Sequence, residues 1–121
     1  MALARAGADV VVAARTETPE QSRLPGTIQQ TADMVRALGR RALPLRVDVT
    51  VDEDVEKMVR QALAEFGRVD ILVNNAGVFP IGPFADLPVR RWDLAIRVNL
   101  RGYFLCIKTV LPHMMQRRSG S

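Results

Sequence analysis

The sequence predicts an α/β fold in which helices cover both faces of a doubly wound parallel sheet. Short runs rich in Val, Leu and Ile alternate along the chain with longer segments whose apolar residues recur at helical spacing. The first of these runs, DVVVAA, shows no alternation of apolar and polar residues, so we expect both faces of that strand to be covered. Short connections between strands and helices favour right-handed crossovers.

The first third of the chain is predicted to contain a helix end, one strand and one complete helix. Residues 1–6 have high helix propensity and stop at Gly7, a residue type that often follows a helix C-terminus. Residues 9–14 form the first buried strand. After a polar loop with two prolines, a second helix ends before Gly39, and its apolar residues are Ile28, Ala32, Val35 and Leu38.

The middle of the chain is predicted to contain two more strands with a helix between them. Residues 43–48 form the second strand, and Thr50 and Glu53 have the spacing of a capping box, which predicts the start of a helix. Gly67 ends that helix after a regular apolar stripe. Residues 70–74 then form the third strand, so we expect three parallel strands.

The last predicted element is a long helix that begins at Pro88, since proline suits a first helical turn. Pro112 is expected to end or kink it, because proline lacks the backbone N–H that a helix interior needs. The apolar residues of this helix are Trp92, Ile96, Tyr103, Ile107, Val110 and Leu111.

Composition indicates one globular domain over residues 1–121. Apolar residues make up 48% of the chain, and 17 Lys and Arg against 13 Asp and Glu leave a net charge of only +4, which excludes a disordered chain. The single cysteine, Cys106, excludes an internal disulfide and a cysteine zinc site, so we expect a reducing, cytoplasmic location and no metal. No apolar run is long enough for a membrane span.

Polar or small residues follow each predicted strand. In open α/β sheets, ligands bind at the carboxyl ends of the strands, so these residues are expected to converge on one crevice. They are the candidate ligand-binding residues: Arg15, Asp48, Val49, Asn74, Asn75, Ala76 and Gly77.

Two motifs, DILVNNAG at residues 70–77 and WDLAIRVNLRGYF at residues 92–104, resemble the short-chain dehydrogenase/reductase family, and the resemblance covers essentially the whole chain. It implies a Rossmann-type sheet and hydride transfer between NADPH and a carbonyl or alcohol carbon of a small molecule. The family's first strand with its TGxxxGxG turn, and its C-terminal half with the catalytic Ser and Tyr-x-x-x-Lys, have no counterpart here. We therefore expect a partial dinucleotide-binding domain that is inactive alone.

The resemblance also implies roles for individual residues. Asp48 would face the adenine amino group with Val49 against the ring, and the NNAG residues would line the cofactor. Asn99 matches the family's catalytic asparagine, which disturbs its helix and holds a water that relays protons. Asparagine inside an apolar helix is otherwise unfavourable, because its side chain competes with the backbone.

Arg15 bears on the choice between NADP and NAD. Folds that bind NAD commonly place a carboxylate after the second strand for the ribose 2′-hydroxyl, whereas an arginine there accommodates the 2′-phosphate of NADP. The sequence after the first predicted strand of this chain, the family's second, reads Arg15-Thr16, with no acid. We expect NADP rather than NAD.

Other interpretations and partners follow from the same residues. A non-catalytic nucleotide-binding α/β domain is the alternative to an enzyme. The basic residues are scattered among acidic ones, so we expect a solvated surface and no nucleic acid partner.

In the family the last helix packs against its copy, which implies a homo-oligomer for the full-length protein. The loop at residues 24–28 (LPGTI) is similar to that of hydroxysteroid dehydrogenase-like members.

Overall fold

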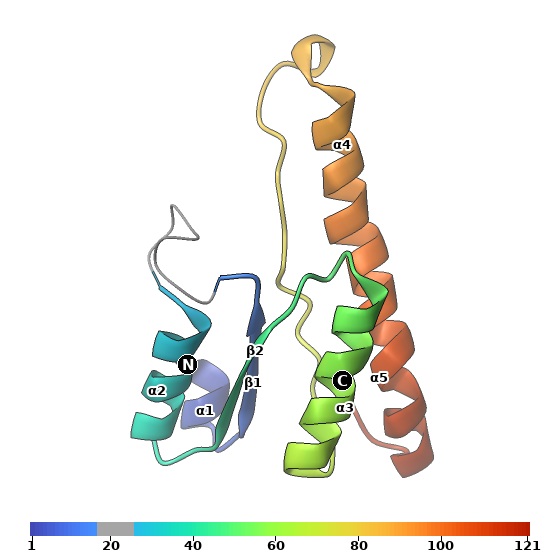
Figure 1. The fold of residues 1–121 in the computed structure, drawn as a ribbon. Coiled ribbons are helices and arrows are strands. Elements are labelled where there is room, and N and C mark those ends of the chain that lie inside the picture. The colour runs from blue at the N-terminus through green and yellow to red at the C-terminus, as the bar shows by residue number, and fades with distance from the viewer. Residues whose placement is uncertain (17–25) are drawn as a thin grey trace.

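A computed structural model describes residues 1–16 and 26–121 of the chain. Helices and strands alternate through the first half, and a long helical rod forms the end (Figure 1). In chain order the elements are α1 (Ala2–Arg5), β1 (Val10–Ala14), α2 (Ile28–Ala37), β2 (Ala42–Arg46), α3 (Asp52–Phe66), a single 3₁₀ turn η2 (Phe84–Asp86), α4 (Val89–Ile96), the π-helical segment η3 (Arg97–Gly102) and α5 (Tyr103–Arg117).

The two strands pair in parallel, which confirms the predicted α/β class. Their register runs from Val10 opposite Ala42 to Ala14 opposite Arg46. Helices α1 and α2 lie on one side of the strands, and α3 and α5 lie on the other (Figure 1). Helices thus flank the sheet on both sides, but the predicted burial of β1 is wrong: Val10, Val11 and Val12 are half-buried, and Ala13 and Ala14 are exposed.

The core consists of small apolar stripes from the helices. Ala32 and Val35 of α2 are buried on one side of the sheet, and Val55 and Val59 of α3 are buried on the other. These stripes match the predicted helical spacing, although Leu38 after α2 is exposed. Burial of such side chains supplies most of the stabilisation of helices this short.

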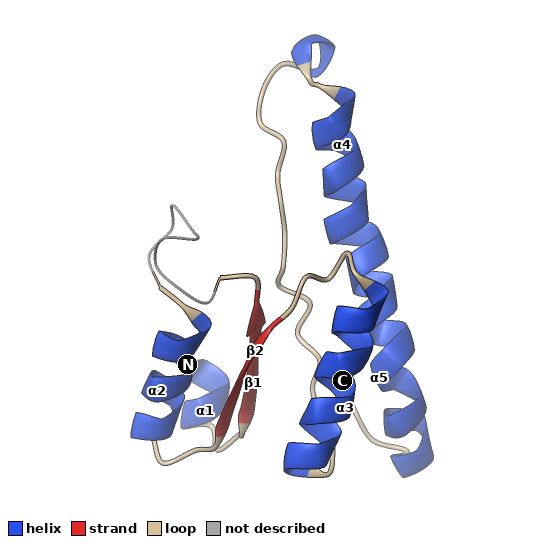
Figure 2. Cartoon of the chain, viewed as in Figure 1, coloured by secondary structure: helices blue, strands red, loops and turns tan. Residues whose placement is uncertain are grey.

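The predicted third strand at residues 70–74 is wrong, because this segment belongs to no sheet (Figure 2). Its hydrogen bonds go to the last residue instead: the Ser121 N–H donates to the Asp70 carbonyl at 2.9 Å, and the Leu72 N–H donates to the Ser121 carbonyl at 2.8 Å. In the usual doubly wound order the first strand lies between the second and fourth strands. Within the described residues the sheet consists of β1 and β2, so residues 70–74 have no strand partner there.

The capping box predicted at Thr50 and Glu53 does not form either. Helix α3 begins at Asp52 with no side-chain cap, and Thr50 instead donates from both its N–H and its hydroxyl to Asp48. A capping box is present at α2, where the Gln30 N–H donates to the Thr27 hydroxyl at 3.1 Å and the Thr27 N–H donates to the Gln30 side chain at 3.1 Å. A local turn with Asp48 thus takes the place of the predicted capping box.

The final helix continues through Pro112, which neither ends it nor breaks it into separate elements. Helix α5 ends at Arg117, and Arg118 follows in the left-handed conformation with φ 52°. The missing N–H of Pro112 costs a hydrogen bond. Burial of Cys106 and Val110 in α5, which packs against α3, offsets that loss. The helix is interrupted earlier, at the π-helical segment η3 that contains Asn99.

Candidate functional site

Residues after β1 and β2 form the first part of the candidate site. Arg15 follows β1 directly, and Asp48 and Val49 lie just beyond β2. The Asp48 carboxylate accepts hydrogen bonds from the Thr50 N–H at 2.9 Å and from the Thr50 hydroxyl at 2.7 Å. The backbone N–H of Asp48 donates to the Asp54 carboxylate at 2.8 Å. Asp48 is therefore held in one orientation by α3 and the turn that precedes it.

The charges around Asp48 keep its carboxylate ionised. Partial burial works against ionisation, but the hydrogen bonds from Thr50 and the positive charges of Arg15 and Arg97 outweigh burial, so the pKa of Asp48 lies below its usual value. An ionised carboxylate only accepts hydrogen bonds, which suits it to an amino group such as that of adenine. Arg97, from η3, was not among the residues singled out in the sequence.

The lowered pKa of Asp48 predicts a pH dependence of folding. The folded-state pKa lies below the ordinary aspartate value of 3.8, so the stabilisation is complete above that pH and is lost as the pH falls through the folded pKa. We expect Asp48→Asn to flatten the fall in unfolding free energy below about pH 4. Urea unfolding followed by circular dichroism between about pH 2 and 6 tests this. Equal slopes for the two proteins would contradict it.

Asn99 and the loop after residues 74–77 form the second part of the site. The Asn99 Oδ1 accepts from the Val78 N–H at 2.9 Å, and its Nδ2 donates to the Val78 carbonyl at 2.8 Å. Asn99 lies within η3, and π-helical turns inside α-helices are frequent at functional sites. The structure thus places a side chain that is unfavourable in a helix at an interruption of the helix, where both ends of its amide are paired.

Gly77 faces Asn99 without being crowded by it. A Cβ at Gly77 would lie 3.6 Å from a Phe79 ring carbon and 3.7 Å from the Asn99 Oδ1, which are ordinary contact distances. Gly77 is also exposed. Nothing in the described part of the chain therefore demands a glycine here.

Gly102 connects the two parts and was missed by the sequence analysis. It is buried at the end of η3, where a Cβ would lie only 2.9 Å from Val49 Cγ2. This contact brings η3 directly against the residue that follows Asp48. A glycine inside an otherwise apolar helix is the signal that could have indicated such a packing role.

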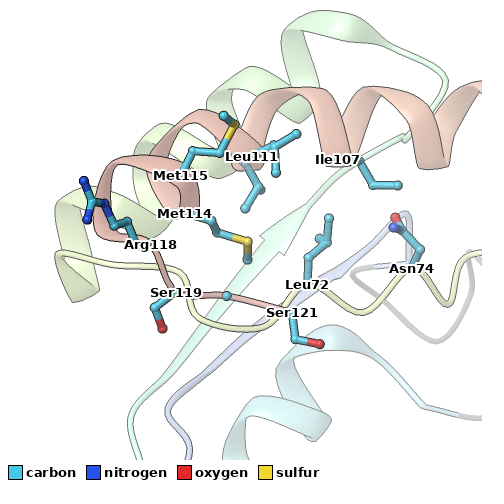
Figure 3. A pocket seen from close by; sticks show the side chains of 11 residues that line it. Leu72, Asn74, Ile107, Leu111, Met114, Met115, Arg118, Ser119 and Ser121 are labelled. Atoms are coloured by element: carbon cyan, nitrogen blue, oxygen red, sulfur yellow. The ribbon is translucent and has the colours of Figure 1, made fainter.

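The remaining predicted residues are not brought into these contacts. Asn75 and Ala76 are exposed, and neither makes a hydrogen bond within the described residues. Asn74 is half-buried and lines a pocket of about 560 Å³ between α5 and the C-terminal residues (Figure 3). The structure therefore brings together Arg15, Asp48 and Val49, and separately Gly77 and Asn99, with η3 between them.

The pocket itself has the character of a protein interior. Its lining is mainly aliphatic and thioether side chains: Leu72, Ile107, Val110, Leu111, Met114 and Met115 (Figure 3). The rest of the lining is Asn74, Arg118, Ser119, Gly120 and Ser121, and all of these except Asn74 lie at the C-terminal end of the chain and not after a strand. We therefore place the candidate site at the strand ends and not in this pocket.

Other kinds of site find little support among residues 1–16 and 26–121. No group of three His, Cys, Asp or Glu side chains gathers there as metal ligands would. Burial raises the pKa of the Cys106 thiol, which disfavours the reactive thiolate. None of the helices in these ranges has the length and apolar character needed to cross a bilayer.

Comparison of the sequence with known proteins identifies a family and several relatives. A family model for short chain dehydrogenases matches residues 1–121. Hydroxysteroid dehydrogenase-like protein 2 of Danio rerio is 40% identical over 116 residues, which cover 96% of this chain and 28% of that protein. The Homo sapiens protein of the same name is 38% identical, covering 95% of this chain and 27% of that protein. The chain thus spans about a quarter of the length of these relatives. The similarity extends well beyond the loop at 24–28, whose first two residues lie outside the described ranges.

Solved structures agree with the sequence relatives. A 3-ketoacyl-ACP reductase from Sinorhizobium meliloti superposes with a TM-score of 0.85 at 35% identity, covering 98% of this chain and 44% of that one. An alcohol dehydrogenase from Thermococcus sibiricus, complexed with 5-hydroxy-NADP, superposes with a TM-score of 0.83 at 26% identity, covering 98% of this chain and 47% of that one. Taken with the family match over every residue, these likenesses show that the chain belongs to the short-chain dehydrogenase family.

Proposed function

We propose that this chain is the adenine-binding part of an NADP-dependent oxidoreductase that transfers a hydride between the nicotinamide and a carbonyl or alcohol carbon of a small molecule. The observation that carries the proposal is the placement of opposite charges, Arg15 and Asp48, just beyond the ends of the two paired strands. Arg15 follows β1, where folds that bind NAD commonly have a carboxylate, and its charge acts on the ionised Asp48 that follows β2.

The residues present fit the adenosine end of such a cofactor. The Asp48 carboxylate would accept from the adenine amino group, Val49 would pack against the ring, and the Arg15 guanidinium matches a 2′-phosphate in a bidentate way. Residues 74–77 would line the rest of the cofactor, and the uncrowded Gly77 leaves a backbone that a ligand can approach closely. The bound nicotinamide supplies the hydride, and the proposed role of Asn99 is to orient a water for proton transfer.

A binding titration with and without the Asp48 carboxylate tests this proposal. We expect the chain to bind NADPH measurably by calorimetry, and Asp48→Ala to weaken that binding about tenfold by removing a charge-assisted hydrogen bond. Asp33→Ala is the matched control, because Asp33 is an exposed aspartate of α2 whose side-chain contacts, with Gln29 and Arg36, stay within its own helix. Equal losses in the two variants, or no binding by the wild-type chain, would overturn the proposal.

We also propose that the full-length protein forms a homo-oligomer through its last helices. A line of exposed apolar side chains runs along α4, η3 and α5 at helical spacing, and monomers rarely leave such a continuous apolar strip uncovered. Its members are Trp92, Ile96, Leu100, Phe104, Ile107, Leu111 and Met115.

Self-association through this strip predicts that one charge on it separates the subunits. Phe104 is 58% exposed, so Phe104→Glu should leave the fold intact while burying a charge in any interface formed there. We expect sedimentation velocity to show a shift toward monomer in this variant. Gln61→Glu, on the exposed face of α3, is the control and should sediment as the wild type does. A wild-type chain that is already monomeric at high concentration would contradict the proposal.

A further inference from the structure

The π-helical segment η3 is attached to three separate parts of the molecule. The Asn99 amide pairs with the backbone of Val78, in the loop before α4. Gly102 packs against Val49, after β2. Arg101 reaches the start of α3, where it pairs with Asp52. The first attachment holds the candidate catalytic side chain, and the other two lie on the adenine side of the site.

The hydrogen bonds from Arg101 to the start of α3 have favourable lengths, but the side chains that make them are partly exposed to solvent. Its Nη2 lies 2.8 and 3.0 Å from the two carboxylate oxygens of Asp52, and its Nη1 donates to the Thr50 carbonyl at 3.3 Å. Both side chains of the ion pair are about half exposed. Exposed ion pairs contribute little to global stability. The effect of this pair is therefore expected in the position of η3 more than in the unfolding free energy.

Gly102 sets how closely η3 approaches β2. A Cβ there would lie 2.9 Å from Val49 Cγ2, 3.2 Å from Val49 Cβ and 3.2 Å from the Val49 carbonyl oxygen. Two of these three atoms are Cβ and a backbone oxygen, which cannot move aside by a simple rotamer change. Any side chain at residue 102 must therefore push η3 away from Val49.

A π-helical turn needs such external attachments. Its i→i+5 hydrogen bonds accommodate one residue more than a regular α-helical turn, and without restraint the segment can revert to α-helix. Reversion to an α-helix would change the rotation of everything before the turn by about 100° relative to α5, which is the rotation of one helical residue. Such a rotation would carry the Asn99 side chain away from Val78.

We propose that Arg101 and Gly102 are positioning residues that hold η3 in its π-helical form and so present the Asn99 side chain to the loop at Val78. The importance of this position for catalysis rests on the proposed function, but the positioning itself does not. Neither residue needs to touch cofactor or substrate. Through the contacts of Arg101 and Gly102, the position of Asn99 depends on the turn that follows Asp48 and Val49.

Hydrogen exchange at the Val78 amide measures the position of Asn99 directly, because that N–H donates to Asn99 Oδ1. With the chain free of nucleotide, we expect Arg101→Asp, Asp52→Arg and Gly102→Ala each to raise the exchange rate of Val78 about tenfold, as Asn99→Ala should. The reciprocal double variant Arg101→Asp/Asp52→Arg should restore protection. Arg60→Asp, which breaks an exposed pair with Glu56, is the control and should change nothing.

A merely structural role would give a different pattern. The Val47 amide, which donates to the Ala14 carbonyl at 3.0 Å, reports on the sheet and should exchange at an unchanged rate in the positioning variants. Loss of protection at both amides, or no change at Val78 in the Arg101 and Asp52 variants, would overturn the proposal. If Gly102→Ala fails to fold, the charge-reversal series still decides it. No nucleotide or activity enters the measurement, so a failed NADP proposal would leave its outcome unaffected.

Discussion

Residues 1–121 alone are expected to turn over no ketone or aldehyde with NADPH. Carbonyl reduction needs a proton donor within hydrogen-bond reach of the substrate oxygen, and such general acid catalysis contributes about 10² to 10⁴ in rate. Tyr103 is the chain's single tyrosine, and the residue four positions later is Ile107 in place of the family's lysine. Asn99 does not replace them, because an amide does not exchange protons usefully near neutral pH.

The absorbance of the reduced nicotinamide, followed over a panel of carbonyl compounds, measures this directly. A full-length family member, such as the 3-ketoacyl-ACP reductase of Sinorhizobium meliloti, is the positive control for the assay. Turnover by this chain above a blank without protein would show that catalytic groups other than the expected tyrosine and lysine exist within it.

Replacing Arg15 is expected to abolish most of any preference for a 2′-phosphate. The chain should bind adenosine 2′,5′-bisphosphate more tightly than adenosine 5′-monophosphate, and Arg15→Ala should reduce the ratio of the two affinities about tenfold by removing a charge-assisted phosphate contact. Binding of the monophosphate should barely change, because it lacks the 2′-phosphate that Arg15 is proposed to contact. Calorimetric titration with each nucleotide measures both affinities.

Two variants sharpen this test. Arg15→Lys keeps the charge but loses the bidentate geometry, so it should recover only part of the ratio. Arg60→Ala removes an exposed arginine from the middle of α3, where it pairs with Glu56, and should leave both affinities unchanged. An unchanged ratio in Arg15→Ala would mean that another group reads the phosphate, and Arg97, whose charge also acts on Asp48, would be the next residue to replace.

Local sequence patterns predicted helix α3 and the strands that find a partner. The apolar run of β1, the stripe of α3 and its end at Gly67 with φ 75° all occur as expected. The strand at 70–74 was predicted from the same kind of run, yet a strand exists only beside a neighbour, and that neighbour is not among the described residues. The helix through Pro112 fails the local rule for a similar reason, since packing against α3 decides it.

The residues of the candidate site also differ in how well the sequence predicted them. Asn99 stands in a recognisable motif and Asp48 lies at the end of a predicted strand, so the sequence indicated both, and their roles toward a cofactor stay predictions. Arg101 and Gly102 lie within the motif at residues 92–104, but the motif does not show which residues they contact. The bonds from Arg101 span 49 and 51 positions of the chain, and such long-range partners cannot be read from spacing. Only the folded arrangement shows that η3 lies against the turn after β2.

Helix α4 extends away from the sheet and carries Trp92, the single tryptophan of the chain, in a half-exposed position (Figure 1). Intrinsic fluorescence excited at the red edge of protein absorption therefore reports on this projecting arm and hardly at all on the buried valines around the strands. A change in emission would register a reorientation of the arm about η3 or its coverage by another chain. Loss of the sheet has to be followed by a backbone signal, so comparing the two signals separates motion of the arm from unfolding of the domain.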